Sequence, residues 1–186
     1  MTEILTCSRT AEQRFSLVIV PKGETFSKLI ELSQHICQRK QAEYKLGEIS
    51  LPHMTLVQFK GTLAQAQEAW KKAANIPVNF EVKLREFYIS NVLENGKCYS
   101  GFRVERNKKM QICHNQLLEC VPKNMVNGAV EDSYFPQVTT ALLEQKDYNN
   151  LDVTKLTSAI NMEEYYFALG ASGEHWQFKE VIEKRI

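Results

Sequence analysis

Two short segments of the chain repeat one pattern of residue types. LPHMTL (51–56) and FPQVTT (135–140) both read apolar-Pro-X-apolar-Thr. The variable third position is His53 in the first segment and Gln137 in the second. Histidine can transfer a proton near neutral pH, whereas a glutamine amide can only donate and accept hydrogen bonds. The two segments therefore have related geometry but different chemical capability.

Each segment places its third residue beside a threonine hydroxyl. Side chains two apart on a strand share one face, about 6.5–7 Å from each other. His53 therefore pairs with Thr55, and Gln137 pairs with Thr139. An imidazole beside a hydroxyl suits a phosphate group, because the ring moves a proton while the hydroxyl donates to a non-bridging oxygen. Two such pairs across a cleft could hold a phosphodiester, with one histidine as general base and the other as general acid.

The elements that must position these pairs follow from hydrophobic periodicity and turn signals. In the first part of the chain we expect strand 14–20, helix 25–44, strand 53–59, helix 63–74, a strand from Val78 through 92, a hairpin turn at 94–96 and a return strand 97–105. In the second part we expect helix 108–121, strand 137–143, a short helix 153–160 and two closing strands, 163–171 and 176–184. Both motifs thus end a strand–helix–strand unit.

The repetition of this unit indicates an internal duplication. Phe15 lies 38 residues before His53, and Phe102 lies 35 residues before Gln137. A pseudo-two-fold repeat that pairs two sheets would bring equivalent strands face to face. We therefore expect the two motifs to line opposite walls of one cleft.

Composition limits the class of protein. The 186 residues, 44% of them hydrophobic, suit one domain or two small lobes that share a core. A net charge of +1 predicts no strong non-specific binding of nucleic acid. The five scattered cysteines favour reduced thiols in a cytoplasmic compartment, and no cluster with metal-ligand spacing is visible, so we expect no metal and no cofactor. The chain has no apolar run long enough for a membrane span and no signal peptide, and we expect a monomer.

With these motifs the chain resembles the 2H phosphoesterase superfamily, which includes bacterial 2′-5′ RNA ligase-like proteins, cyclic nucleotide phosphodiesterases and viral enzymes that cut 2′-5′ oligoadenylate. The resemblance also covers the opening strand RFSLVIVP (14–21), the middle hairpin and the closing segment FALGASGEHWQFKEVIE (167–183). It implies an α/β fold of the α+β kind, with two pseudo-symmetric antiparallel sheets forming a central cleft and helices outside. The whole of 1–186 would then be one domain of two lobes.

The resemblance also implies the site. His53, Thr55 and Thr139 match the family pattern, and Gln137 departs from it. Loss of one general acid or base typically costs about 10²–10⁴ in rate, although a glutamine can still bind a phosphoryl oxygen. A substitute acid could come from His114, His175 or Tyr134, of which only Tyr134 is near the second motif in sequence.

The remaining candidates are less specific. Lys83 and Arg85, on the polar side of the middle strand, and Tyr134 are candidate substrate-binding residues, while Tyr88 and Tyr99 could stack on bases. We expect His114 to be a surface or flanking residue of its helix. We expect His175 to be an ordinary residue of the final turn.

Three functions remain open. The first is a metal-independent phosphodiesterase for cyclic phosphates or 2′-5′-linked oligonucleotides and RNA ends, with reduced or altered activity because of Gln137. The second is a non-catalytic protein that binds a nucleotide or RNA end in the same cleft. The third is an interaction module that has lost the ligand. The presence of Thr139 beside Gln137 favours ligand binding over complete decay.

Overall fold

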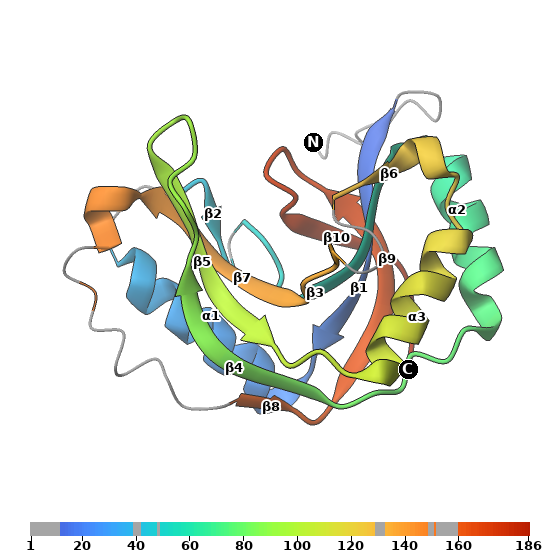
Figure 1. Cartoon of the computed structure of the whole chain (residues 1–186), viewed down its shortest axis with the longest axis horizontal. Helices are drawn as coiled ribbons and strands as arrows, with labels where there is room; N and C mark the ends of the chain where they lie inside the picture. The colour runs from blue at the N-terminus through green and yellow to red at the C-terminus, as the bar shows by residue number, and fades with distance from the viewer. Residues whose placement is uncertain (1–11, 39–41, 48, 129–132, 149–150, 152–159) are drawn as a thin grey trace, which may run out of the picture.

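Two five-stranded antiparallel sheets form the framework of the protein (Figure 1). The computed structural model describes residues 12–38, 42–47, 49–128, 133–148, 151 and 160–186. The first sheet has the order β10-β9-β1-β3-β6, and the second has the order β2-β7-β5-β4-β8. The mixed fold of two antiparallel sheets with helices is therefore as expected.

The element bounds are as follows. The first part of the chain forms β1 (Gln13–Pro21), α1 (Gly23–Cys37), β2 (Tyr44–Lys45), β3 (Met54–Gly61), α2 (Leu63–Lys72), the 3₁₀ turn η1 (Ala73–Asn75), β4 (Val82–Ile89) and β5 (Lys97–Val104). The second part forms α3 (Lys108–Glu119), η2 (Lys123–Met125), β6 (Val126–Asn127), β7 (Gln137–Glu144), η4 (Gln145–Tyr148), β8 (Ile160–Met162), β9 (Tyr165–Ser172) and β10 (Phe178–Arg185).

The two sheets are built on one plan. Each has a central opening strand, β1 or β5, that lies between the motif strand, β3 or β7, and a strand from elsewhere in the chain, β9 or β4. The remaining strands, β10 and β6 in the first sheet and β8 and β2 in the second, occupy matching edges. This equivalence of strand order confirms the expected internal pseudo-symmetry.

Each half of the chain contributes a helix and an edge strand to the sheet that contains the motif strand of the other half. Strand β2 precedes β3 in sequence but pairs with β7, and β6 precedes β7 but pairs with β3. In the same way α1 packs on β7, whereas α3 packs on β3. Figure 1 shows α1 behind the second sheet, with α2 and α3 together against the first. The motif strands themselves approach each other where the two sheets meet.

A β-bulge follows the threonine of each motif. In the first sheet the register shifts so that Thr55 lies opposite Val18 and Leu56 is the extra residue. In the second sheet Thr139 lies opposite Gly101, and Thr140 is the extra residue. A bulge leaves a residue out of the ladder and bends the strand. Both motifs therefore share not only a pattern of residues but also a local distortion of the backbone.

Side chains from the helices satisfy the carbonyl groups that the bulges leave unpaired. His114 of α3 donates from Nδ1 to the carbonyl oxygen of Leu56 at 2.7 Å. Ser33 of α1 donates to the carbonyl oxygen of Thr140 at 2.6 Å and accepts from the amide of Leu46 at 2.9 Å. Buried backbone groups need such partners. The swapped helices thus support the bulges of the motif strands.

Several boundaries differ from expectation. The predicted helix 25–44 ends at Cys37, because Gln38 takes a left-handed conformation with φ 45° and its amide bonds to Gln34. The strand expected from Val78 begins only at Val82. The predicted helix 153–160 lies outside the described residues, except that Ile160 begins β8.

The predicted alignment of the two repeats, which matches Phe15 with Phe102, is wrong. Because Val18 and Gly101 are the residues opposite the two threonines, they are the true equivalents, and Phe15 does not correspond to Phe102. The corrected intervals, 18 to 55 and 101 to 139, differ by a single residue. The turn at 94–96 is as expected, with Gly96 at φ 78°. No helix among the described residues is long and apolar enough to cross a membrane.

Candidate active site

The four motif residues line one pocket of about 370 Å³ between the two sheets. Its walls come from both halves of the chain. Its lining includes Tyr44, His53, Thr55, Gln58, Tyr99, His114, Tyr134, Phe135, Gln137, Thr139, His175 and Trp176. His53 and Gln137 thus share a cavity, as the duplication predicts.

His53 is held in one orientation just before β3. Its ring is 5% exposed and lies 5.3 Å, between ring centroids, from Phe178. Nδ1 is 2.7 Å from the carbonyl oxygen of Leu51, which can only accept, so Nδ1 carries the proton of the neutral ring. Nε2 is then a free acceptor, and it has no hydrogen-bond partner among the described residues. Burial lowers the pKa of His53 to about 4, partly opposed by the Leu51 hydrogen bond, so the ring is neutral near pH 7.

The second motif presents a hydroxyl and an amide. Gln137 is exposed at the start of β7, and Thr139 is half-buried two residues further along the same face. Tyr88 of β4 lies behind Thr139. Burial raises the pKa of Tyr88 to about 12, although the Thr139 hydroxyl partly offsets this effect. The two hydroxyls are neighbours without the geometry of a full hydrogen bond, so the Tyr88 oxygen stays without a partner among the described residues.

Tyr134 has a supporting role in the first motif. Its hydroxyl donates to the carbonyl oxygen of Thr55 at 2.8 Å, and burial raises its pKa. Its ring stacks on His114 at 3.9 Å. The hydroxyl predicted to meet substrate is therefore already engaged with the backbone of β3.

His114 is buried, contrary to the expectation of a surface residue. It is 1% exposed, with Nδ1 bonded to Leu56 and with a buried Nε2 that has no partner in the described part of the chain. Burial lowers its pKa. The helical pattern around Cys113 gave no sign of this, because α3 turns His114 toward the bulge of a strand that is 58 residues away in sequence.

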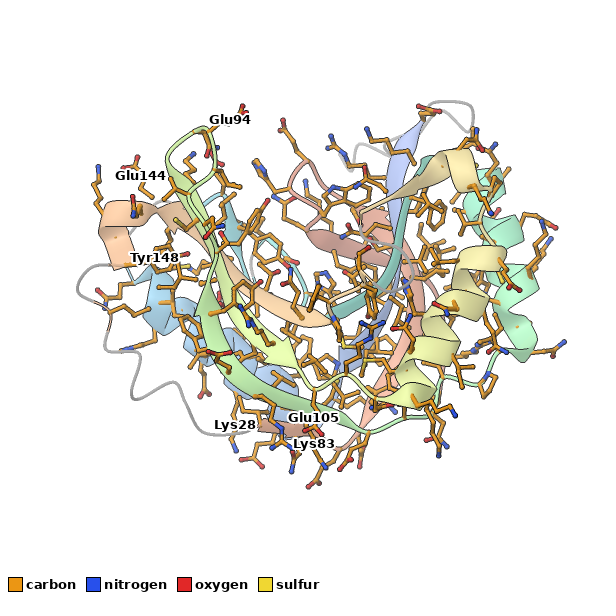
Figure 2. All side chains as sticks on the ribbon, in the orientation of Figure 1. Lys28, Lys83, Glu94, Glu105, Glu144 and Tyr148 are labelled. Atoms are coloured by element: carbon orange, nitrogen blue, oxygen red, sulfur yellow. The ribbon has the colours of Figure 1, made fainter. Side chains whose placement is uncertain are left out.

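Lys83 and Arg85 do not line the pocket. Lys83 forms an ion pair with Glu81 at 2.7 Å, and the Arg85 Nε donates to Glu105 at 2.6 Å. Figure 2 shows Lys83 and Glu105 at the bottom edge of the molecule, far from the hairpin tip at Glu94. The prediction that they bind substrate gains no support from this placement, and we leave both out of the proposed site.

Sequence reasoning missed several pocket residues. Tyr44 and Trp176 were not singled out. His175 was named among the possible substitute acids but was expected to be an ordinary loop residue. Tyr99, expected as a stacking surface, does line the pocket. Phe135, the first residue of the second motif, is 76% exposed and also lines the pocket. A sequence signal existed only for Phe135, which occupies the apolar position of the motif itself.

The pocket is rich in histidine and contains no lysine or arginine among its described lining residues. The side chains there that could become cationic are His53, His114 and His175. In the described part of the chain, no three His, Cys, Asp or Glu side chains are grouped to hold a metal ion. The described lining residues offer proton transfer by imidazoles and hydrogen bonding by neutral groups.

Comparison with known proteins places this geometry in a known fold. No family model matches the sequence, and no curated protein matches it significantly. Solved structures do match. A phosphoesterase structure aligns with a TM-score of 0.58 at 14% identity, covering 94% of this chain and 98% of that one. E. coli LigT complexed with 3′-AMP aligns with a TM-score of 0.57 at 14% identity, covering 94% and 96%.

Apo E. coli LigT aligns similarly, with a TM-score of 0.56 at 13% identity over 95% of this chain and 98% of that one. At such identity the likeness establishes the fold alone. The agreement extends over almost the full length of each chain. The chain therefore has the same fold as E. coli LigT and the phosphoesterase structure, in agreement with the fold that its resemblance to the 2H phosphoesterases implies.

Proposed function

We propose that this protein binds a nucleotide or RNA-end phosphate in the pocket and acts on it as a phosphodiesterase of reduced activity. The preferred substrates are a 2′,3′-cyclic phosphate or a 2′-5′-linked oligonucleotide. The observation that carries the proposal is the orientation of His53, whose bonded Nδ1 leaves Nε2 as an acceptor in the pocket that also contains Gln137 and Thr139.

The proposed reaction is hydrolysis by general-base catalysis. His53 Nε2 takes a proton from a water molecule as its oxygen forms the new bond to phosphorus. The P–O bond to the ribose oxygen breaks, and the leaving oxygen must receive a proton. Thr55 and Thr139 would donate hydrogen bonds to the non-bridging oxygens, and the amide of Gln137 would do the same. A neutral His53 can accept this proton, although its lowered pKa makes it a weaker base than a free imidazole, and it is a poor donor because little of it is protonated near pH 7.

The relatives support the choice of ligand. E. coli LigT has been crystallised with 3′-AMP, with ATP and with NADP⁺, so the same fold accepts nucleotides. The aromatic side chains of Tyr99, Phe135 and Trp176 give the pocket surfaces on which a base could stack.

The alternative is a nucleotide-binding protein without turnover. It is favoured by one observation, the exposed Gln137 at the position where the family pattern has its second histidine. An amide there can hold a phosphoryl oxygen but cannot transfer a proton. Binding would then persist while catalysis is lost.

Cleavage of 2′,3′-cyclic AMP and of a 2′-5′-linked adenylate dimer, with binding of 3′-AMP by calorimetry, tests both functions. We expect slow turnover that His53→Gln lowers by about 10²–10⁴-fold, because the general base is lost. His35→Gln is the matched control, since His35 is exposed on α1. Binding of 3′-AMP without any cleavage supports the alternative. If 3′-AMP does not bind and neither substrate is cleaved, both functions are wrong.

A further inference from the structure

The proposed reaction lacks a proton donor for the leaving oxygen. Gln137 cannot supply the proton, and His53 is the base. Among the pocket histidines, His114 is unsuitable because its Nδ1 is bonded to the backbone and its Nε2 is buried. His175, on the loop between β9 and β10, is the third. Its side chain is partly accessible, at 29% of its surface.

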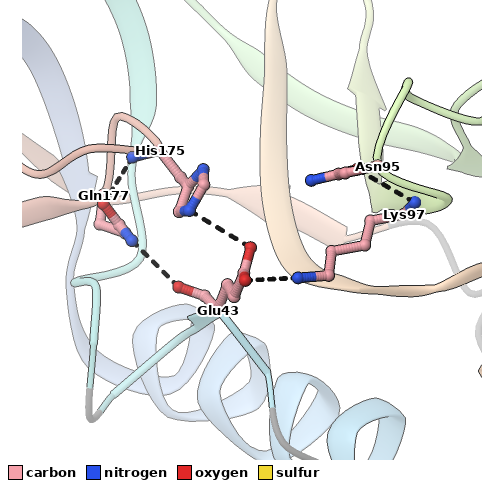
Figure 3. Close-up of polar contacts among 5 residues, drawn as sticks. All are labelled: Glu43, Asn95, Lys97, His175 and Gln177. Carbon is pink, nitrogen blue, oxygen red and sulfur yellow. Dashed lines mark hydrogen bonds and ion pairs between the residues drawn. The ribbon is translucent and has the colours of Figure 1, made fainter.

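A carboxylate orients the His175 ring. Nε2 of His175 lies 3.3 Å from Oε2 of Glu43, a contact that becomes an ion pair when the ring is protonated (Figure 3). The other oxygen of Glu43 is paired with Lys97 Nζ, and this hydrogen bond lowers the pKa of Glu43. Glu43 is therefore ionised near neutral pH and can hold an imidazolium. Nδ1 of His175 has no partner among the described residues and is free to meet a ligand.

The loop that carries His175 is fixed by a buried glutamine. The side chain of Gln177 accepts from the backbone amide of His175 at 3.0 Å and donates to the backbone carbonyl of Glu43 at 3.0 Å (Figure 3). Trp176, between them, has φ 58°, a conformation that costs a non-glycine residue energy. Retention of a strained backbone in a loop beside a pocket is typical of a functional position.

The same loop is connected to the segment that carries His53. The amide of Phe178 donates to the Ser50 hydroxyl at 3.0 Å, and the amide of Leu51 donates to the carbonyl of Phe178 at 2.8 Å. Phe178 also packs its ring against His53. His175 is thus three residues before Phe178, which contacts His53. Both histidines line the same cavity.

We propose that His175, oriented by Glu43, is the general acid that replaces the missing histidine at position 137. This inference rests on the proposed phosphodiesterase function. As the P–O bond to the ribose oxygen breaks, that oxygen takes the proton from Nδ1 of the His175 imidazolium, while His53 Nε2 receives the proton of the attacking water. His175 ends neutral and His53 ends protonated. Proton exchange with solvent restores both rings, and the net change is addition of one water molecule.

Leaving-group dependence tests this role. A ribose alkoxide needs a proton to leave, whereas the nitrophenolate of bis(p-nitrophenyl) phosphate does not. We expect His175→Gln to lower kcat for 2′,3′-cyclic AMP by about 10²-fold or more and to leave cleavage of the nitrophenyl ester nearly unchanged. Glu43→Gln, which changes a positioning residue, should give a smaller loss with the same substrate preference. Adding Gln137→His to His175→Gln should restore part of kcat by returning an imidazole to the second motif.

The outcomes separate this inference from the proposed function. If His53→Gln abolishes cleavage but His175→Gln matches the His35→Gln control, the role of His175 is wrong and the phosphodiesterase stands. Equal losses on both substrates would show a structural effect and would also overturn the proposal. Retained nitrophenyl esterase activity shows in the same experiment that the variant is folded. If the wild-type protein cleaves neither the nitrophenyl ester nor 2′,3′-cyclic AMP nor the 2′-5′-linked adenylate dimer, both the phosphodiesterase function and the role of His175 are wrong.

Discussion

One hydrogen bond decides which nitrogen of His53 is left as a free acceptor. The carbonyl of Leu51 holds the proton on Nδ1, and burial against Phe178 keeps the ring neutral. Gln137 faces solvent at the matching position and has no titratable group. At the residue scale the site is therefore asymmetric, with a titratable imidazole in one motif and a hydrogen-bonding amide in the other.

The burial of His53 predicts an acid-sensitive fold. Its pKa is about 4 in the folded protein and about 6.5 when unfolded, so the unfolded chain binds more protons between these values. The contribution of His53 to the unfolding free energy is therefore complete above the pKa of the unfolded chain. It is lost as the pH falls toward the pKa of the folded protein. We expect the loss of unfolding free energy between about pH 7 and pH 5 to be smaller by about 2 kcal/mol in His53→Gln than in the wild type.

Urea unfolding at the two pH values measures this difference. His114, whose pKa is also lowered by burial, adds to the sensitivity of both proteins equally. His35→Gln again provides the control. Equal pH dependence in the wild type and in His53→Gln would mean that the folded protein does not hold His53 neutral.

At the scale of elements, the paired bulges position the motif threonines. Each bulge lies directly after a threonine, and each depends on a helix from the other half of the sequence for a partner to its carbonyl. A bulge re-aims the side chains around it. Strand pairing and helix contacts therefore together set the orientation of the two threonine side chains.

Gly101 makes the bulge in the second sheet possible. A Cβ at this position would lie 2.2 Å from the carbonyl oxygen of Val138 and 2.9 Å from the Cα of Thr139. These are backbone atoms that cannot move aside without separating β5 from β7. We expect Gly101→Ala to lower the unfolding free energy by about 3 kcal/mol, at the upper end for overpacking, and to weaken binding of 3′-AMP.

Gly96→Ala provides the comparison for Gly101→Ala. The added Cβ lies in open space, so the only penalty comes from the positive φ of 78°. We expect this substitution to lower the unfolding free energy by about 1–2 kcal/mol. Binding of 3′-AMP by calorimetry should be unchanged in this variant. A Gly101→Ala protein that binds like the wild type would contradict the role of the bulge.

At the scale of the whole molecule, the exchange of helices and edge strands joins the two sheets. The elements α1 and β2 precede the first motif in the sequence but pack against the second sheet. Neither lobe can therefore form from one half of the chain alone. The same holds for α3 and β6. We therefore expect the described lobes to unfold in a single transition.

Ser33→Ala tests this coupling from a distance. The hydroxyl of Ser33 lies behind the second sheet and bonds to the Thr140 carbonyl and the Leu46 amide. Its loss leaves both groups without this partner, and we expect the unfolding free energy to fall by about 1–3 kcal/mol. Both tryptophans report on the first sheet, since Trp70 stacks on Phe167 of β9 and Trp176 lies against Arg14 of β1. We expect the fluorescence transition and the far-UV circular dichroism transition to shift together. A shift in circular dichroism alone would mean that the lobes unfold separately.

The sequence by itself determined the parts of this protein that depend on local pattern. The alternation and apolar runs of the strands, the turn at Asn95-Gly96 and the periodicity of α3 predict most elements, because each reflects how neighbouring residues share one face. The paired motifs predicted the two sheets and the shared pocket, and they identified His53, Thr55, Gln137 and Thr139 as its lining.

Only the tertiary structure decided which other residues join them. Glu43 and His175 are far apart in the chain, and they meet because β2 crosses to the second sheet while the β9–β10 loop extends over the cleft from the first. His114 and Tyr134 likewise turned from candidate site residues into supports of β3. Such contacts depend on the register and crossing of distant strands, and local residue patterns carry no information on either. The residue types of the first motif could thus be read from the sequence, whereas the contact of His175 with Glu43 could be found only in three dimensions.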